Sequence, residues 1–306
     1  MKVSEEYYQN IENARRAYKD GNLSYAIELF EFAMSEIADE NDMLDLGILY
    51  MENNETSKSL ALINNVIDEF PRHARGYYCM GYVLEELDKK EEALNYYKNA
   101  YKLEKNSSKY SLAVARMYDE INNLSEAIKY YEITICLDKN NYWAHLNLGS
   151  LYERENKLDL ALEYTLKAYE IDSNMPMVNY NLGVIYYRTN KYDLSLKHYM
   201  AETKVEGCYY KLVYYNIGIL YKDVFKDYEK AKYYYLKGLY LDKEDISLWY
   251  NLGCLYTLLK DYDNAYQCLL FVCLKKKKSF SWIEEDGELI EFRKTPQYKK
   301  LRNEVN

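Results

Sequence analysis

The sequence contains little proline and little glycine, with 3 and 11 residues out of 306. A β-sandwich or barrel needs many tight turns, and this composition is too poor in turn residues for such a fold. Histidine is scarce as well, and His73, His145 and His198 share no spacing. Motifs of the HExxH, GxSxG and phosphate-loop types are absent. We therefore expect a protein that is not an enzyme and that needs no cofactor or metal.

No hydrophobic run is long enough for a membrane span, which takes about 18 uncharged apolar residues. The first residues also lack the apolar core of a signal peptide. Cysteines occur without CxxC spacing, as expected for small buried side chains in a reducing compartment. They are Cys79, Cys136, Cys208, Cys254, Cys268 and Cys273. These features predict a cytoplasmic protein that does not bind membranes.

The chain has fewer basic than acidic residues: 40 Lys and Arg against 49 Asp and Glu, which gives a net charge of -9. An acidic surface repels phosphate backbones, so we expect no binding of nucleic acid. One basic run exists, Lys275 to Lys278. We interpret it as the exposed last turn of a helix, where cations interact favourably with the helix dipole. A patch for nucleic acid or membrane is the alternative.

The sequence does contain a repeat. A small residue returns every 33 to 35 residues, at Ala14, Gly47, Gly81, Ala115, Gly149, Gly183, Gly218 and Gly253. A second small residue follows in each unit, and a large one comes four residues later in most units, for example Tyr199 after Ser195. Each half-unit has apolar residues three, four and seven apart, which predicts an amphipathic helix. We therefore predict an all-α solenoid of about eight hairpins, each formed by a helix A and a helix B. The small residues would let the two helices pack closely.

This pattern resembles the tetratricopeptide-repeat family, whose period is about 34 residues. In the last unit the matching residues are Trp249, Leu252, Gly253, Tyr256 and Ala265. The resemblance extends over about residues 7 to 279 and implies a right-handed α-α superhelix with helix A on its concave side. The units that we expect within residues 1–279 span 7–39, 40–73, 74–107, 108–141, 142–175, 176–210, 211–245 and 246–279. The seventh unit has one extra residue, which we place in its turn around Asp223 to Asp227.

Residues 280–306 do not continue the repeat. They resemble the closing segment of bacterial stand-alone arrays of this family. We expect them to pack on the last unit and cover its apolar face, as a cap must.

Four asparagines at the sixth position of units five to eight form the main candidate site: Asn147, Asn181, Asn216 and Asn251. The row resembles the asparagine array in the repeat domain of O-linked N-acetylglucosamine transferase, which implies that the amides hold the backbone of an extended peptide. Aromatic and basic side chains nearby would form pockets for its side chains. These are Tyr180, Tyr215, Tyr250, Tyr187 and Arg188. Alternatively, the asparagines bond neighbouring repeats and the tyrosines pack between them.

Units three and four carry acidic residues on helix A instead: Glu85, Glu86, Asp119 and Glu120. A concave acidic strip would attract a basic segment, although a merely solvated face has the same composition.

The function that we predict is that of a scaffold or adaptor binding an extended peptide or partner protein in its groove. A receptor for signalling peptides and a self-assembling structural protein, hence a homo-oligomer, are the alternatives.

Overall fold

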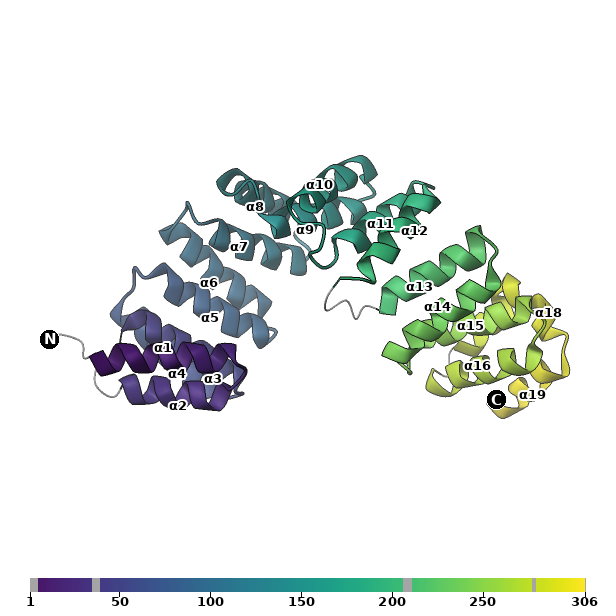
Figure 1. Cartoon of the computed structure of the whole chain (residues 1–306), viewed down its shortest axis with the longest axis horizontal. Helices are drawn as coiled ribbons and strands as arrows, with labels where there is room; N and C mark the ends of the chain where they lie inside the picture. Colours follow the sequence, from purple (N-terminus) through teal and green to yellow (C-terminus); the bar gives the residue numbers. More distant parts are fainter. Residues whose placement is uncertain (1–4, 35–38, 206–210, 277–278, 306) are drawn as a thin grey trace. The chain divides into compact units, whose positions relative to one another are not determined.

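The computed structural model of the chain is built from helices joined by short turns (Figure 1). It describes residues 5–34, 39–205, 211–276 and 279–305, and these residues contain no strand. Helices A and B alternate along the chain in eight pairs, so the prediction of an all-α repeat solenoid is confirmed. The chain divides into two compact units, Met1–Leu151 and Tyr152–Asn306.

The N-terminal unit stacks four hairpins. They pair α1 (Glu5–Lys19) with α2 (Leu23–Met34), α3 (Glu40–Glu52) with α4 (Thr56–Glu69), α5 (Ala74–Glu86) with α6 (Lys90–Leu103), and α7 (Ser108–Glu120) with α8 (Leu124–Leu137). Helix α9 (Tyr142–Arg154) begins in this unit and ends in the next. Helix B contacts the helix A that follows it in the pairs α2–α3, α4–α5 and α6–α7, and α3 also contacts α5. The A helices of this unit therefore lie next to one another.

The C-terminal unit continues with α10 (Leu158–Ile171) and three further hairpins. They pair α11 (Val178–Arg188) with α12 (Tyr192–Glu202), α13 (Lys211–Ile219) with α14 (Tyr228–Leu241), and α15 (Ile246–Leu258) with α16 (Tyr262–Lys275). Short helices close the chain: α17 (Phe280–Glu285), η3 (Gly287–Leu289), α18 (Ile290–Arg293) and α19 (Pro296–Val305).

The recurring glycine of helix A lies against the large side chain of helix B in the same hairpin. A Cβ atom on Gly81 would come within 2.7 Å of the Tyr97 ring, and one on Gly183 within 2.5 Å of the Tyr199 ring. Gly47, Gly218 and Gly253 face Ile63, Tyr235 and Leu269 in the same way. Glycine inside a helix costs about 1 kcal/mol relative to alanine. The close approach of the two helices explains why the sequence accepts that cost.

We expect Gly218→Ala to destabilise the seventh hairpin by up to about 2 kcal/mol. The added methyl group would come within 2.3 Å of the ring of Tyr235, which is fully buried. Overpacking costs about 1 to 3 kcal/mol, and the gain in helix propensity returns about 1 kcal/mol. Hydrogen exchange of the α13 and α14 amides measures the change. Gly287→Ala is the control, because its Cβ would meet nothing within 4 Å; equal exchange rates in both variants would contradict this packing.

The turns between helix A and helix B repeat one backbone conformation. In each of them one residue has a positive φ between 55° and 80°: Gly21, Asn54, Asp88, Asn122, Asn156, Asn190, Lys226 and Lys260. Glycine and asparagine tolerate this left-handed region best, which explains the composition of most of these turns.

The extra residue of the seventh unit lies in the helix rather than in the turn. Helix α13 is continued by a π-helix, η1 (Leu220–Val224), in which the Phe225 N–H donates to the Leu220 carbonyl over 3.0 Å. A π-turn absorbs one residue without breaking the helix. Lys222 lies in this π-helix and is buried, with 3% of its surface exposed.

The closing helices pack on the last hairpin. Ile283, Leu289, Phe292 and Leu301 are fully buried and share one apolar cluster with Ala265 and Leu269 of α16. The Lys222 ammonium donates to both carboxylate oxygens of Glu288, over 2.8 and 2.9 Å. This ion pair joins the π-helix to the closing segment.

Cys79, Cys254, Cys268 and Cys273 are buried as expected, whereas Cys136 is exposed. Burial raises the pKa of the Cys79 thiol to about 11 and that of Cys268 to about 12, so both stay protonated at neutral pH.

Cys208, Lys277 and Lys278 lie outside the described residues. In the described ranges no group of three His, Cys, Asp or Glu side chains could hold a metal ion, and no helix is both long and apolar enough to span a membrane.

Candidate functional site

The predicted asparagine row divides between the two units. Asn147 belongs to the N-terminal unit, while Asn181, Asn216 and Asn251 lie on the A helices α11, α13 and α15 of the C-terminal unit. All four are half-buried. The Asn216 amide donates to the Tyr199 hydroxyl over 3.2 Å, and the Asn251 amide donates to the Ser247 carbonyl over 2.9 Å. The side chains of Asn147 and Asn181 make no hydrogen bond to the described part of the chain.

The tyrosines that precede these asparagines bridge neighbouring repeats. Tyr180 contacts Asn216, which tends to lower the pKa of its hydroxyl, although burial outweighs this effect and raises the pKa. Tyr215 accepts a hydrogen bond from Asn251 over 3.4 Å, and the Tyr250 hydroxyl donates to Asp286 over 2.7 Å. Each partner lies 36 residues further along the chain. Asp286 of the closing segment therefore takes the place that an asparagine occupies in the preceding repeats.

Tyr187 and Arg188 also make contacts within the C-terminal unit. The Arg188 guanidinium donates to the Glu153 carbonyl over 2.6 Å and to the Asn156 side chain over 2.6 Å, and it pairs with the Glu153 carboxylate. The Tyr187 ring lies 5.7 Å from the ring of Tyr192 and remains 36% exposed. Arg188 thus connects two repeats, whereas Tyr187 still presents part of its ring to solvent.

Two of the four acidic residues of units three and four form ion pairs. Glu85 accepts a hydrogen bond from the Tyr97 hydroxyl over 2.6 Å and forms an ion pair with Arg116. Glu120 pairs with Lys90 over 3.0 Å, and Asp119 is half-buried. Glu86 is exposed and makes no ion pair with any described residue. The strip is therefore less negative than its sequence indicates.

A pocket that the sequence analysis missed opens on the A helices of the N-terminal unit. Its volume is about 480 Å³, and it is lined by side chains of α1, α3 and α5 together with Phe30 of α2 and Lys109 of α7. We call it the α1–α7 pocket. Half-buried Ile48, Tyr78 and Tyr82 contribute apolar surface. A volume of this size is typical of pockets that hold a ligand.

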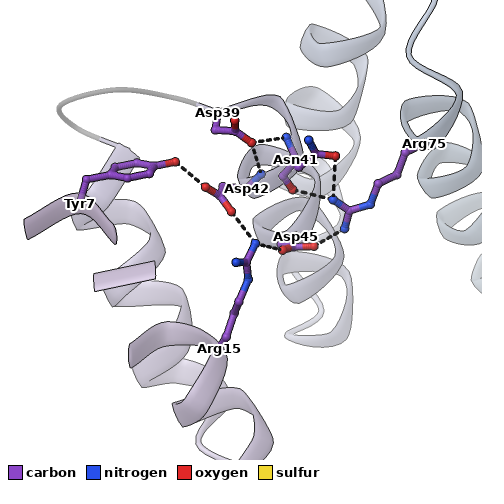
Figure 2. Close-up of polar contacts among 7 residues, drawn as sticks. All are labelled: Tyr7, Arg15, Asp39, Asn41, Asp42, Asp45 and Arg75. Carbon is purple, nitrogen blue, oxygen red and sulfur yellow. Dashed lines mark hydrogen bonds and ion pairs between the residues drawn. The ribbon is translucent and has the colours of Figure 1, made fainter. Parts of the chain in front are cut away.

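A polar network supports one wall of this pocket (Figure 2). The Tyr7 hydroxyl donates to Asp42 over 2.5 Å, and Arg15 donates to Asp42 over 2.7 Å and to Asp45 over 3.0 Å. Arg75 pairs with Asp45 and donates to the Asn41 carbonyl over 3.0 Å. Two guanidinium groups are thereby held against the carboxylates of α3.

Asp42 is the buried centre of this network, with 6% of its surface exposed. Burial raises the pKa of its carboxyl group, while the hydrogen bond from Tyr7 and the charge of Arg15 act in the opposite direction. The carboxyl group of Asp39 caps α3 by accepting from the N–H groups of Asn41 and Asp42. The network therefore also fixes the start of α3.

The sequence signal for this pocket is weak because its residues do not recur. Arg75 and Lys109 occupy the second position of units three and four, whereas units two and five have Asn41 and Trp143 there. Repetition along the sequence marks only the positions that have the same packing role in every hairpin. A search for repeats does not find a pocket whose residues differ from one repeat to the next.

Two sequence models, both described as tetratricopeptide repeat, match the chain. One matches residues 44–109 and 112–176, and the other matches residues 246–270, which together make up half of the chain. The chain belongs to the tetratricopeptide-repeat family. The family predicted from the glycine and alanine spacing is thus confirmed.

Solved structures share the tetratricopeptide-repeat architecture. A structure of pilF from Pseudomonas aeruginosa matches with a TM-score of 0.61 and 18% identity, over 68% of this chain and 94% of that chain. The Cut9-Hcn1 hetero-tetramer of APC/C matches with a TM-score of 0.65 and 16% identity. This match covers 92% of this chain and 52% of that chain. A tetratricopeptide repeat protein from Parabacteroides merdae matches with a TM-score of 0.59 and 15% identity. This match covers 78% of this chain and 94% of that chain. At these identities the likeness shows the fold alone. The comparison with curated protein sequences gave no match.

Tetratricopeptide repeats form a non-catalytic scaffold that binds protein or peptide partners. The general function of this chain is therefore protein–protein interaction.

Proposed function

We propose that this tetratricopeptide-repeat protein is a cytoplasmic scaffold or adaptor that holds an extended segment of a partner protein against its A helices. The observation that carries the proposal is the α1–α7 pocket, a hollow of about 480 Å³ on the A helices of the N-terminal unit. Aromatic and apolar side chains beside charged ones are the composition of protein-binding surfaces. We do not propose that the partner is a nucleic acid or a membrane, because the chain is acidic overall.

The asparagine row is proposed as a second contact surface for the same segment or for another one. The Asn181 amide has no hydrogen-bond partner in the described chain, and the side-chain oxygens of Asn216 and Asn251 accept no hydrogen bond there. An amide with an unused acceptor can bind the N–H group of a peptide without reading its side chains. The donors of Asn216 and Asn251 would stay bonded between repeats.

The combined substitution Asn181→Ala and Asn216→Ala is expected to reduce capture of the partner by about tenfold or more, because two peptide contacts are lost. The measurement is affinity purification from the native cell with quantitative mass spectrometry, using the full chain as bait. Asn174→Ala with Asn303→Ala serves as the matched control, since both side chains are exposed in the same unit. Equal capture by both double variants would show that the row only joins repeats.

A further inference from the structure

We propose that the occupant of the α1–α7 pocket is an acidic segment in which carboxylate side chains flank one large apolar or aromatic side chain. This inference rests on the proposed function and names the chemistry of the partner that the pocket accepts. It follows from the apolar floor, from the unpaired cations around it, and from the network that holds the pocket in shape.

The floor of the pocket is apolar. Phe30, Leu49 and Cys79 line it with at most 4% of their surface exposed, and half-buried Ile48 and Tyr82 add to it. Burying one large apolar side chain is worth about 1.5 to 3 kcal/mol. A single leucine, phenylalanine or tyrosine of the partner therefore suits this floor as an anchor.

The charges around the floor are mainly positive. Four cationic side chains line the pocket, and only two carboxylates, Asp45 and Glu52, line it with them. Lys19 and Lys109 are exposed and make no ion pair in the described ranges, although the Lys109 ammonium lies 4.2 Å from the centre of the Tyr78 ring. This excess of positive charge stands out in a chain with a net charge of -9.

Arg15 adds donors to this set. Its Nη2 atom serves both Asp42 and Asp45, whereas its Nη1 and Nε atoms make no hydrogen bond to described residues. A guanidinium group presents five N–H donors in a fixed plane. The remaining donors of Arg15 can therefore bind a carboxylate of the partner while the network stays intact.

The network makes the pocket a preformed site. Tyr7 and Asp42 hold Arg15 from one side, and Asp45 and Asn41 hold Arg75 from the other (Figure 2). Less ordering of these side chains is then needed on binding, which favours affinity. A lysine-rich or arginine-rich segment would bring its cations beside Lys19, Arg15 and Lys109, where like charges repel. An acidic segment thus fits this pocket better than a basic segment does.

The test is a selection from a phage-displayed library of random linear peptides, with the full chain as bait. We expect the enriched peptides to carry Asp or Glu on both sides of Leu, Phe or Tyr. One such peptide is then synthesised with a fluorescent label, and its affinity is measured by anisotropy. The variant Lys19→Glu with Lys109→Glu should bind it at least about tenfold more weakly. Lys226→Glu with Lys260→Glu makes the same change of charge on exposed turns of the C-terminal unit and should bind it normally.

The outcomes separate this inference from the proposed function. Enrichment of basic or uncharged peptides would overturn the acidic partner while supporting a peptide-binding role. An acidic peptide whose affinity survives the Lys19 and Lys109 substitutions but falls in the Asn181 and Asn216 variant would also overturn it, because that peptide occupies the asparagine row. Absence of any enriched peptide would count against both.

Discussion

Replacing Glu288 by alanine should open the closing segment about a hundredfold more often, a loss of about 3 kcal/mol. Glu288 is the main partner of Lys222, which is buried; among the residues that the structure describes, Asp223 is its one other carboxylate, at 3.3 Å. Glu288 itself is 37% exposed, but removing it leaves the Lys222 charge buried with one carboxylate fewer. Removing the partner of a buried charge costs about 3 to 5 kcal/mol, and the exposure of Glu288 reduces this figure. The remaining contact with Asp223 places the effect at the lower end of this range.

Limited proteolysis in native buffer measures this opening as the rate of cleavage within residues 280–305. Glu291→Ala is the matched control, since its ion pair with Lys294 is exposed on the neighbouring helix α18 and such pairs contribute little. Lys222→Met added to Glu288→Ala should restore slow cleavage, because an apolar side chain then fills the buried position. Cleavage of the Glu288 variant at the rate of the Glu291 variant would refute this role of the pair.

Glu202→Ala is expected to destabilise the start of α11 by about 3 kcal/mol. Glu202 is fully buried at the end of α12, and its carboxylate accepts hydrogen bonds from the Met177 N–H over 2.8 Å and the Tyr180 N–H over 3.1 Å. A hydrogen bond to a charged group contributes about 1.5 to 3 kcal/mol, and donors left buried without a partner cost more. The alanine variant removes the acceptor for both N–H groups.

Hydrogen exchange of amides 177 to 182 reports this change directly. The control is Glu170→Ala on α10, whose side chain is exposed. If these amides exchange at the same rate in both variants, Glu202 does not hold the first turn of α11.

Glu202 also predicts how stability depends on pH. Burial raises the pKa of its carboxyl group, while the N–H groups of Met177, Tyr180 and Asn179 oppose the rise. An unfolded glutamate has a pKa of about 4.3, so the folded chain binds this proton more tightly. The contribution of Glu202 is therefore fully present below about pH 4.3 and is lost as the pH rises through the raised pKa. Compared with Glu202→Gln, the wild type should gain stability on acidification; a constant or reversed difference would contradict the raised pKa.

The repeat and the hairpins could be predicted from sequence because close packing imposes the same demand in every unit. Gly183 faces Tyr199 and Gly218 faces Tyr235 for one steric reason, and that reason leaves a regular spacing of small and large residues. Together with apolar residues three, four and seven apart, which predict helices, this spacing predicts an all-α repeat fold. The π-helix at Leu220–Val224 could not be foreseen, because an extra residue fits equally well in a turn or in a helix.

The candidate site was harder to predict, because the position of a polar side chain in the repeat does not identify its hydrogen-bond partners. Asn216 and Asn251 recur at one position, yet their amides donate to Tyr199, Tyr215 and the Ser247 carbonyl. Nothing in the sequence indicated that the Glu85 carboxylate is paired, but Arg116, 31 residues further along the chain, forms an ion pair with it. Such partners depend on side chains of the next helix, which periodicity does not reveal.

Asp286 has a consequence for how this array can grow. The closing segment places its carboxylate against Tyr250, where a ninth hairpin would present its own asparagine, and it buries Leu289 and Phe292 against α16. The C-terminal face is therefore already occupied by the chain itself. A second molecule could not continue the stack at this end unless it first displaced residues 280–305. Joining arrays end to end at this face would therefore require the closing segment to move first.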